Sequence, residues 1–179
     1  MKHLEETILT TRTLFEGRVV KLDVHDVRLP NGETSTREII RHSGAAAIVP
    51  LDADDQVVLV RQYRLAARRL MLEIPAGVLS PGEDPLVCAV RECQEETGLK
   101  PGQVEPLGGF FVAPGYTAEY IHLFVGRDLT ASQLDGDIDE FVEVVRMPLT
   151  EAVRMAVAGE LHDSKTIIAL LKVARMHGL

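Results

Sequence analysis

The segment from residue 77 to residue 99, GVLSPGEDPLVCAVRECQEETGL, places three glutamates within five positions. Glu92, Glu95 and Glu96 lie next to one another or about one turn apart if the segment is helical. Like charges at this spacing destabilise a helix by roughly a few tenths of a kcal/mol per pair, so they need either open water or a cation. Carboxylate oxygens are the ligands that Mg²⁺ prefers. The cluster therefore indicates either a solvated helix face or a divalent metal site.

Apolar spacing predicts a helix over residues 84–97. Four residues recur at intervals of four, three and four, which is helical spacing: Leu86, Val90, Cys93 and Thr97. Gly98 follows as the expected C-terminal stop. On a helical wheel of about 100° per residue, the three glutamates fall on an arc beside this apolar arc. We expect the carboxylates at the edge of the buried face, where partly buried like charges recruit a counter-ion.

The segments around this helix predict mostly strands. Residues 7–43 alternate apolar and polar positions around Asn31-Gly32, a hairpin signal, and so predict an antiparallel N-terminal strand set. Further strands are expected within residues 44–52, 56–64, 70–77, 104–115, 118–129 and 141–148, with Pro75 and Gly77 ending the third of them. Two helical patterns follow, at 149–158 and 163–177. This order predicts a mixed β-sheet flanked by helices, an α+β domain of the α/β/α sandwich type.

Composition restricts the partners of the chain. Its 179 residues suffice for one main domain, and a net charge of -8 argues against affinity for nucleic acid or anionic membranes. The N-terminus lacks the apolar core of a signal peptide, and no stretch approaches the roughly 18 apolar residues of a membrane span. We expect a cytoplasmic protein. Cys88 and Cys93, about 140° apart on the helix, are expected to be reduced core residues.

Residues 77–99 resemble the Nudix box: Gly, five residues, Glu, seven residues, Arg-Glu, apolar, any, Glu-Glu, any, Gly, apolar. The pattern is matched at Gly77, Glu83, Arg91, Glu92, Cys93, Glu95, Glu96, Gly98 and Leu99. Cys93 stands where the family more often has Leu, Ile or Val. The resemblance implies a Nudix hydrolase, an α/β/α sandwich that cleaves a nucleoside diphosphate linked to another moiety and uses Mg²⁺ or Mn²⁺.

The resemblance also implies roles for the residues of the box. Glu92 and Glu96 correspond to the firmest metal ligands of the family, and Glu95 often joins them. The backbone carbonyl before the box glycine, here that of Ala76, commonly contributes as well. The remaining box positions are expected to hold the ligand carboxylates in place: Gly77, Glu83 and Arg91.

Outside the box the chain resembles the ADP-ribose pyrophosphatase branch of the family, in the segments REIIRH, VRQYR, EIPAG and VAPGYTAEYIHLF. The resemblance implies that Arg37 and Arg64 contact the substrate diphosphate, the former across a dimer, because the planar guanidinium can bond two oxygens. A surface ion pair with a neighbouring Glu is the alternative for each Arg. Pro114 and Gly115 match a substrate loop of this branch.

The general base in this branch comes from a mobile acidic loop before a late strand, which corresponds to DGDIDEFVEV here. Glu140 is the favoured base, Asp139 the next candidate and Glu119 a third. Some members of the branch stack an N-terminal Trp on adenine, but this chain has no Trp, and Phe15 is equally well explained as a core residue.

These observations predict metal-dependent hydrolysis of ADP-ribose, a nucleoside diphosphate sugar, to AMP and ribose 5-phosphate. Residues 1–43 are expected to dimerise and contact substrate, and residues 44–179 to form the Nudix domain. A homodimer is expected because short N-terminal strands with an uncapped edge favour pairing. The alternatives are hydrolysis of another nucleoside diphosphate sugar or nucleotide, a non-catalytic nucleotide-binding regulator, and a structural domain with a solvated glutamate helix.

Overall fold

The computed structural model describes residues 2–136 and 141–179. Within it the chain forms two compact units, residues 1–44 with 111–120 and residues 45–110 with 121–179. The first unit thus combines the N-terminal segment with a loop from the middle of the chain. No helix among the described residues is long and apolar enough to cross a bilayer.

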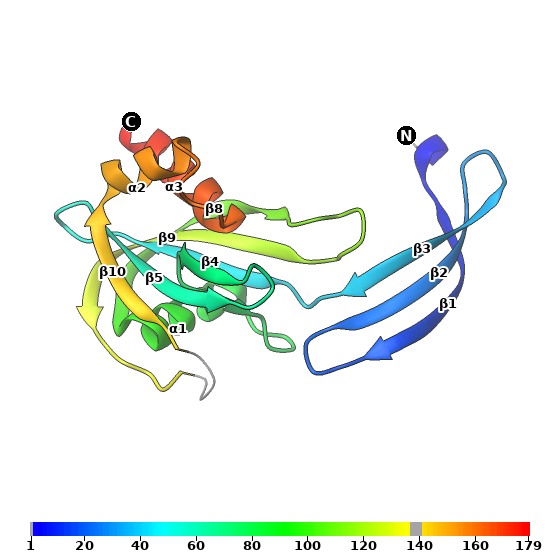
Figure 1. Ribbon diagram of the computed structural model, residues 1–179, viewed down its shortest axis with the longest axis horizontal. Helices are drawn as coiled ribbons and strands as arrows, with labels where there is room; N and C mark the ends of the chain where they lie inside the picture. The colour runs from blue at the N-terminus through cyan, green and yellow to red at the C-terminus, as the bar shows by residue number, and fades with distance from the viewer. Residues whose placement is uncertain (1, 137–140) are drawn as a thin grey trace. The chain divides into compact units, whose positions relative to one another are not determined.

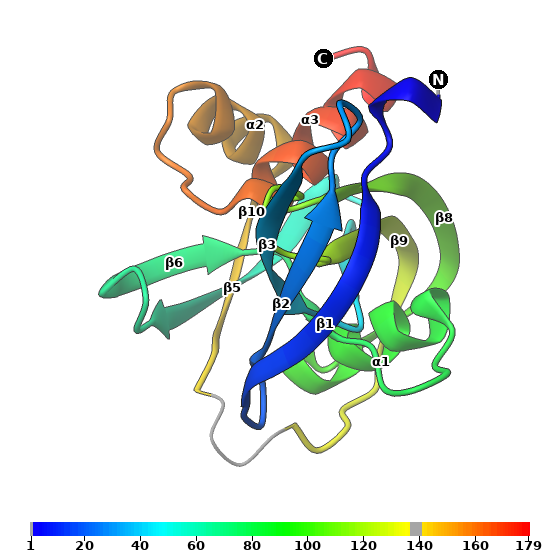
Figure 2. The same cartoon turned by 90° about the vertical axis from the view of Figure 1, so that its right-hand side faces the viewer.

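The first unit contains a three-stranded antiparallel sheet in the order β1-β2-β3 (Figure 2). A short 3₁₀ turn precedes it, and the elements are η1 Lys2–Leu4, β1 Thr7–Glu16, β2 Lys21–Arg28 and β3 Thr34–Arg41. The predicted hairpin turn joins β2 to β3, and Gly32 adopts a φ of 91° there, which favours glycine. In the loop of residues 111–120, the carbonyl of Tyr116 accepts a hydrogen bond from the amide of Ile40 on β3, at 2.8 Å.

The second unit is built from two sheets and three helices. One sheet has the order β7-β4-β9-β8, with β4 parallel to β9 and antiparallel to β7, and the other has the antiparallel order β10-β5-β6. The strands are β4 Ala45–Pro50, β5 Gln56–Arg64, β6 Arg69–Glu73, β7 Ala76–Val78, β8 Leu99–Phe111, β9 Tyr120–Ala131 and β10 Glu143–Pro148. The helices are α1 Pro85–Thr97, α2 Leu149–Val157 and α3 Ser164–His177.

Helices cover both faces of the mixed sheet (Figure 1). On β4, Ala46 and Ile48 pack with the buried residues of α1, whereas Ala47 and Val49 belong to the larger core that includes α2 and α3. This follows from the alternation of side chains along a strand. The predicted α/β/α sandwich is confirmed. One boundary was wrong: Pro75 divides the predicted strand 70–77 into β6 and β7, so that Gly77 lies inside a strand instead of ending one.

Candidate active site

Local signals fix both ends of α1, the helix that carries the glutamates. Asp84 caps its N-terminus and accepts a hydrogen bond from the amide of Leu86 at 2.8 Å, and Pro85 occupies the first helical position. Gly98 ends the helix with a φ of 71°, in the left-handed region. The helix predicted over residues 84–97 is therefore confirmed, and its glutamates lie on one rigid element.

The buried face of α1 differs from the predicted one. Leu86, assigned to the apolar face, is 41% exposed. Helix α1 instead packs on β4 and β9 through small residues: Cys88, Ala89 and Cys93. Glu92 and Glu96 are themselves buried, at 8% and 5% exposure, so they lie within the buried face instead of at its edge. Of the other three predicted positions, Cys93 is fully buried and Val90 and Thr97 are partly buried, so Leu86 is the exposed exception.

Strand β7 lies directly against these buried carboxylates. A Cβ atom placed on Gly77 would meet Oε1 of Glu92 at 1.8 Å, so only a glycine leaves room for this side chain. The amide of the preceding residue, Ala76, donates a hydrogen bond to Oε2 of Glu96 at 3.3 Å. The backbone of Ala76 and Gly77 on β7 therefore contacts the carboxylates of both Glu92 and Glu96.

Arg91, on the same helix, pairs with three glutamates. Its Nε lies 3.0 Å from Oε1 of Glu83, and its Nη1 lies 2.7 Å from a carboxylate oxygen of Glu92 and of Glu95. The hydrogen bond to Glu83, followed by the charges of the other two glutamates, raises the pKa of Arg91 above its ordinary value. The hydrogen bond from Arg91 in turn lowers the pKa of Glu83. Arg91 thus offsets the like charges of Glu92 and Glu95 on adjoining turns.

The residues of this site fit a hard divalent cation. The donors are all oxygens, and the Glu92 carboxylate occupies the space that a Cβ of Gly77 would fill, so it lies directly against β7. Over the ranges that the structure describes, no three His, Cys, Asp or Glu side chains converge in metal-ligand geometry. Two of the three glutamates are instead bound by Arg91.

Arg64, the predicted substrate contact at the end of β5, lies in the same unit as α1. Its Nε and Nη2 lie 2.8 and 2.7 Å from the two carboxylate oxygens of Glu73, a residue only 1% exposed. Lys165 of α3 reaches the same carboxylate. An ion pair with a Glu was the alternative for Arg64 and is present here, but the sequence named neither Glu73 nor Lys165. The available signal for Glu73 was a lone carboxylate in the apolar run LMLEIPAG.

The other predicted site residues are found elsewhere. Arg37 and Glu119 belong to the first unit, where Arg37 pairs with Glu6, and Glu119 lies 4.0 Å from Nε2 of His42. Pro114 and Gly115 lie in the loop 111–120 of that unit. The two favoured bases, Asp139 and Glu140, fall outside the described residues.

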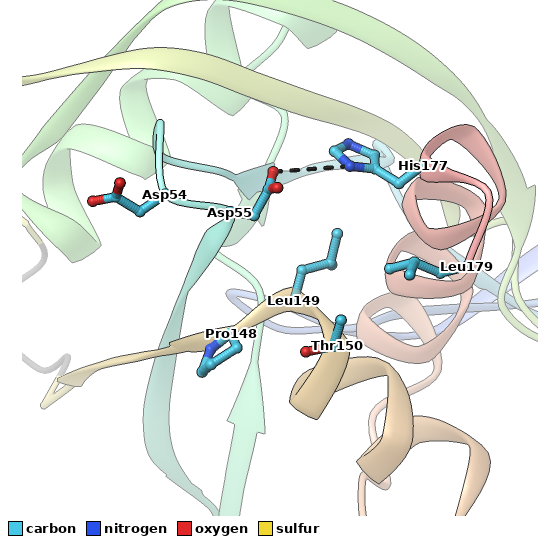
Figure 3. A pocket seen from close by; sticks show the side chains of 7 residues that line it. All are labelled: Asp54, Asp55, Pro148, Leu149, Thr150, His177 and Leu179. Carbon is cyan, nitrogen blue, oxygen red and sulfur yellow. Dashed lines mark ion pairs between the residues drawn. The ribbon is translucent and has the colours of Figure 1, made fainter.

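A separate pocket of about 290 Å³ lies where β10 meets α2, beside the end of α3 (Figure 3). Asp55 and His177 face each other across it, with 3.8 Å between Oδ1 and Nδ1. None of the predicted site residues lines this pocket.

Two family descriptions cover most of the chain. Residues 41–170 match the NUDIX domain, and residues 6–40 match the nucleoside diphosphate sugar hydrolase N-terminal domain. The match covers well over half of the sequence and includes every carboxylate of α1. The chain belongs to the Nudix family.

Individual proteins resemble the chain over nearly its full length. A methanol dehydrogenase activator from Bacillus methanolicus is 45% identical, covering 94% of this chain and 92% of that protein. An ADP-ribose pyrophosphatase from Bacillus subtilis (strain 168) is 38% identical, covering 95% and 93%. The solved structure of an ADP compounds hydrolase superposes with a TM-score of 0.85 at 26% identity, covering 96% and 94%.

Proposed function

We propose that this chain hydrolyses the diphosphate of ADP-ribose to AMP and ribose 5-phosphate. The observation that carries the proposal is the carboxylate cluster of α1, in which Glu92 and Glu96 are buried against β7. Two like-charged carboxylates buried on adjoining turns favour a bound cation, because burying charge without full compensation has a large desolvation cost. The choice of ADP-ribose is supported by the pyrophosphatase relative that matches over almost the whole chain.

Each residue of the cluster has a proposed task. Glu92, Glu95 and Glu96, with the carbonyl of Ala76, hold Mg²⁺ or Mn²⁺, and Arg91 with Glu83 orients their side chains. A cation held by these residues would supply charge neutralisation of the diphosphate and activation of water. The oxygen of water bonds to one phosphorus as the bridging P–O bond breaks, and the base takes the proton. We propose Glu140 as this base, Asp139 next and Glu119 third.

We also propose a homodimer formed through residues 1–43. Every residue of β1 is exposed, including the apolar side chains of Ile8, Leu14 and Phe15, which are all more than half exposed. An edge strand with unpaired backbone groups and apolar side chains readily pairs with a second copy. In such a dimer, Arg37 of one chain contacts substrate held by its partner. The free thiols of Cys88 and Cys93 fit a reducing compartment, and we place the enzyme in the cytoplasm.

The test measures AMP release from ADP-ribose in Mg²⁺ or Mn²⁺ by the parent chain and by Glu96→Gln. Loss of a metal carboxylate removes several kcal/mol of transition-state stabilisation, so kcat/KM is expected to fall at least about 100-fold. Glu105→Gln makes the same charge change at an exposed position of β8 and is expected to retain parental activity. Equal rates in all three chains would remove the assigned role of Glu96. Absence of AMP release by the parent chain would overturn the assignment of ADP-ribose as substrate. A panel of other nucleoside diphosphate sugars and nucleotides would then be assayed.

A regulatory function is the second candidate, favoured by the 45% identity to the methanol dehydrogenase activator. In the test, the parent chain or the Glu96→Gln variant is added to a methanol dehydrogenase, and the rate of methanol oxidation by the dehydrogenase is measured. Activation by the parent alone indicates a regulator that acts through hydrolysis. Equal activation by both chains indicates regulation without catalysis.

A further inference from the structure

Glu73 is an acidic residue buried deep in the second unit, outside the Nudix box. It ends β6, is 1% exposed, and faces two cations from different elements. Arg64 of β5 binds both carboxylate oxygens at 2.8 and 2.7 Å, and Nζ of Lys165 lies 2.5 Å from Oε2. Burial would raise the pKa of Glu73, but the hydrogen bonds and charges of these two partners outweigh it and hold the pKa below its ordinary value. Glu73 is therefore an ionised anchor.

The anchor fixes only one edge of the Arg64 guanidinium. Nε and Nη2 are engaged by Glu73, whereas Nη1 has no hydrogen-bond partner among the residues that the structure describes. The Arg64 side chain is 43% exposed. A two-point contact sets the plane of a guanidinium, which can then present its remaining N–H groups to a second anion. Arg64 thus has a fixed inner edge and an open outer edge.

The same anchor is connected to the carboxylates of α1. Three residues after Glu73, the amide of Ala76 donates to Glu96, and between them the amide of Ile74 donates to Oγ1 of Thr166 at 2.8 Å. The hydrogen bond with Glu73 raises the pKa of Arg64 against the effect of burial, and the charge of Glu96 contributes in the same direction. One short segment therefore fastens Arg64 to both α1 and α3.

Lys165 has a specific part in this arrangement. A buried carboxylate needs full compensation, and removal of one partner leaves charge uncompensated. Because Lys165 supplies a second positive charge, Glu73 does not depend on Arg64 alone. Lys165 is also 3.0 Å from Asp163, which caps α3 and accepts hydrogen bonds from Thr166. The first turn of α3 thus holds Glu73 in place.

We propose that Glu73 and Lys165 are positioning residues that aim the outer edge of Arg64 at the substrate diphosphate beside α1. The inference rests on the proposed function, because it takes a diphosphate as the anion that Arg64 meets. It adds the start of α3, some 70 residues beyond the Nudix box, to the residues that organise the site.

A double-mutant cycle tests the proposal. Lys165→Met keeps the aliphatic stem and removes the charge, and Arg64→Ala removes the group that it is proposed to position. We expect Lys165→Met to raise KM for ADP-ribose and lower kcat/KM about tenfold when Arg64 is present, and to have little further effect in Arg64→Ala. Lys165→Arg should recover part of the loss. Lys172→Met, at an exposed position of the same helix, is the matched control.

A binding measurement complements the kinetics, using ADP-ribose with EDTA so that no turnover occurs. The dissociation constant should rise in Lys165→Met, and that rise should vanish in the Arg64→Ala background. If Lys165→Met does not fold, the combined change Glu73→Gln with Lys165→Met removes both charges of this buried pair and enters the same cycle.

Four results would overturn the proposal. Equal losses from Lys165→Met with and without Arg64 would make its role structural only, as would a lower melting temperature with unchanged KM and kcat. Absence of AMP release by the parent chain would overturn the proposed function along with this inference. Release that is insensitive to Lys165 would overturn the inference alone.

Discussion

The contact between β7 and Glu92 predicts that Gly77→Ala destroys activity while leaving the fold intact. The backbone of Gly77 does not adopt the left-handed region, so alanine is accepted without backbone strain. Its new methyl group, however, would lie 1.8 Å from Oε1 and 2.1 Å from Cδ of Glu92. The substitution therefore acts on one proposed metal ligand through a single atom.

The size of the effect follows from these distances. Real Cβ contacts are essentially never shorter than 3.0 Å, so the carboxylate oxygen must retreat by about 1.2 Å. Metal–ligand distances tolerate only about 0.2 Å, and a misplacement of about 1 Å costs roughly 100-fold in rate. We expect kcat/KM to fall at least about 100-fold, which is about 2.7 kcal/mol. Folding is affected less, because overpacking of about 1–3 kcal/mol is partly offset by the lower entropy of the unfolded chain.

The assay compares Gly77→Ala with Gly102→Ala, a matched change on β8 whose Cβ would meet nothing nearer than 3.2 Å. Three quantities are measured for each: AMP release from ADP-ribose, Mn²⁺ affinity by titration calorimetry, and the melting temperature. The reasoning is refuted if Gly77→Ala is folded, binds Mn²⁺ as the parent does, and keeps kcat/KM within about threefold. Loss of activity in both variants would point to a general effect of added methyl groups.

Two further predictions concern the thiols and the N-terminal strand. Burial raises the pKa of Cys88 to about 12 and that of Cys93 to about 11, so both thiols should react with a disulfide reagent at pH 8 far more slowly in the native than in the unfolded chain. Labelling of the native chain at the rate of the unfolded chain would contradict this burial. Since both pKa values lie above that of an unfolded thiol, the free energy of unfolding should fall as pH rises from about 9 towards 11. Leu14→Lys on β1 should convert a dimer to a monomer in sedimentation velocity, whereas Val157→Lys, which alters an exposed apolar residue of α2, should not. A parent chain that sediments as a monomer would end the dimer proposal.

Local signals account for what the sequence predicted well. Asp84, Pro85 and Gly98 define the ends of α1, and Asn31-Gly32 defines the turn between β2 and β3. These features depend on backbone preferences that act over a few residues, so they can be predicted from the sequence alone. The glutamate spacing on α1 was likewise readable, because helical periodicity alone brings these side chains to one side.

Longer-range features were not readable in the same way. Helical spacing placed Leu86 on the buried face of α1, whereas that face is extended through Cys88, Ala89, Glu92 and Glu96, because the position of the sheet decides which side of the helix is covered. The division of the strands into two sheets and the transfer of loop 111–120 to the first unit depend on pairing between distant segments. Such pairing has no local sequence signal.

The sequence by itself determined the chemistry of α1, since residue types and helical spacing suffice to gather carboxylates. Arg91 reaches Glu92 and Glu95 within the helix itself, but only the tertiary structure decided how Glu92 and Glu96 are enclosed, because β7 must approach them in space. Glu73 and Lys165 make the same point, since 92 positions separate them and their buried charges still meet at 2.5 Å. A buried ion needs a partner whose position depends on packing across the whole unit, and no local pattern specifies that partner.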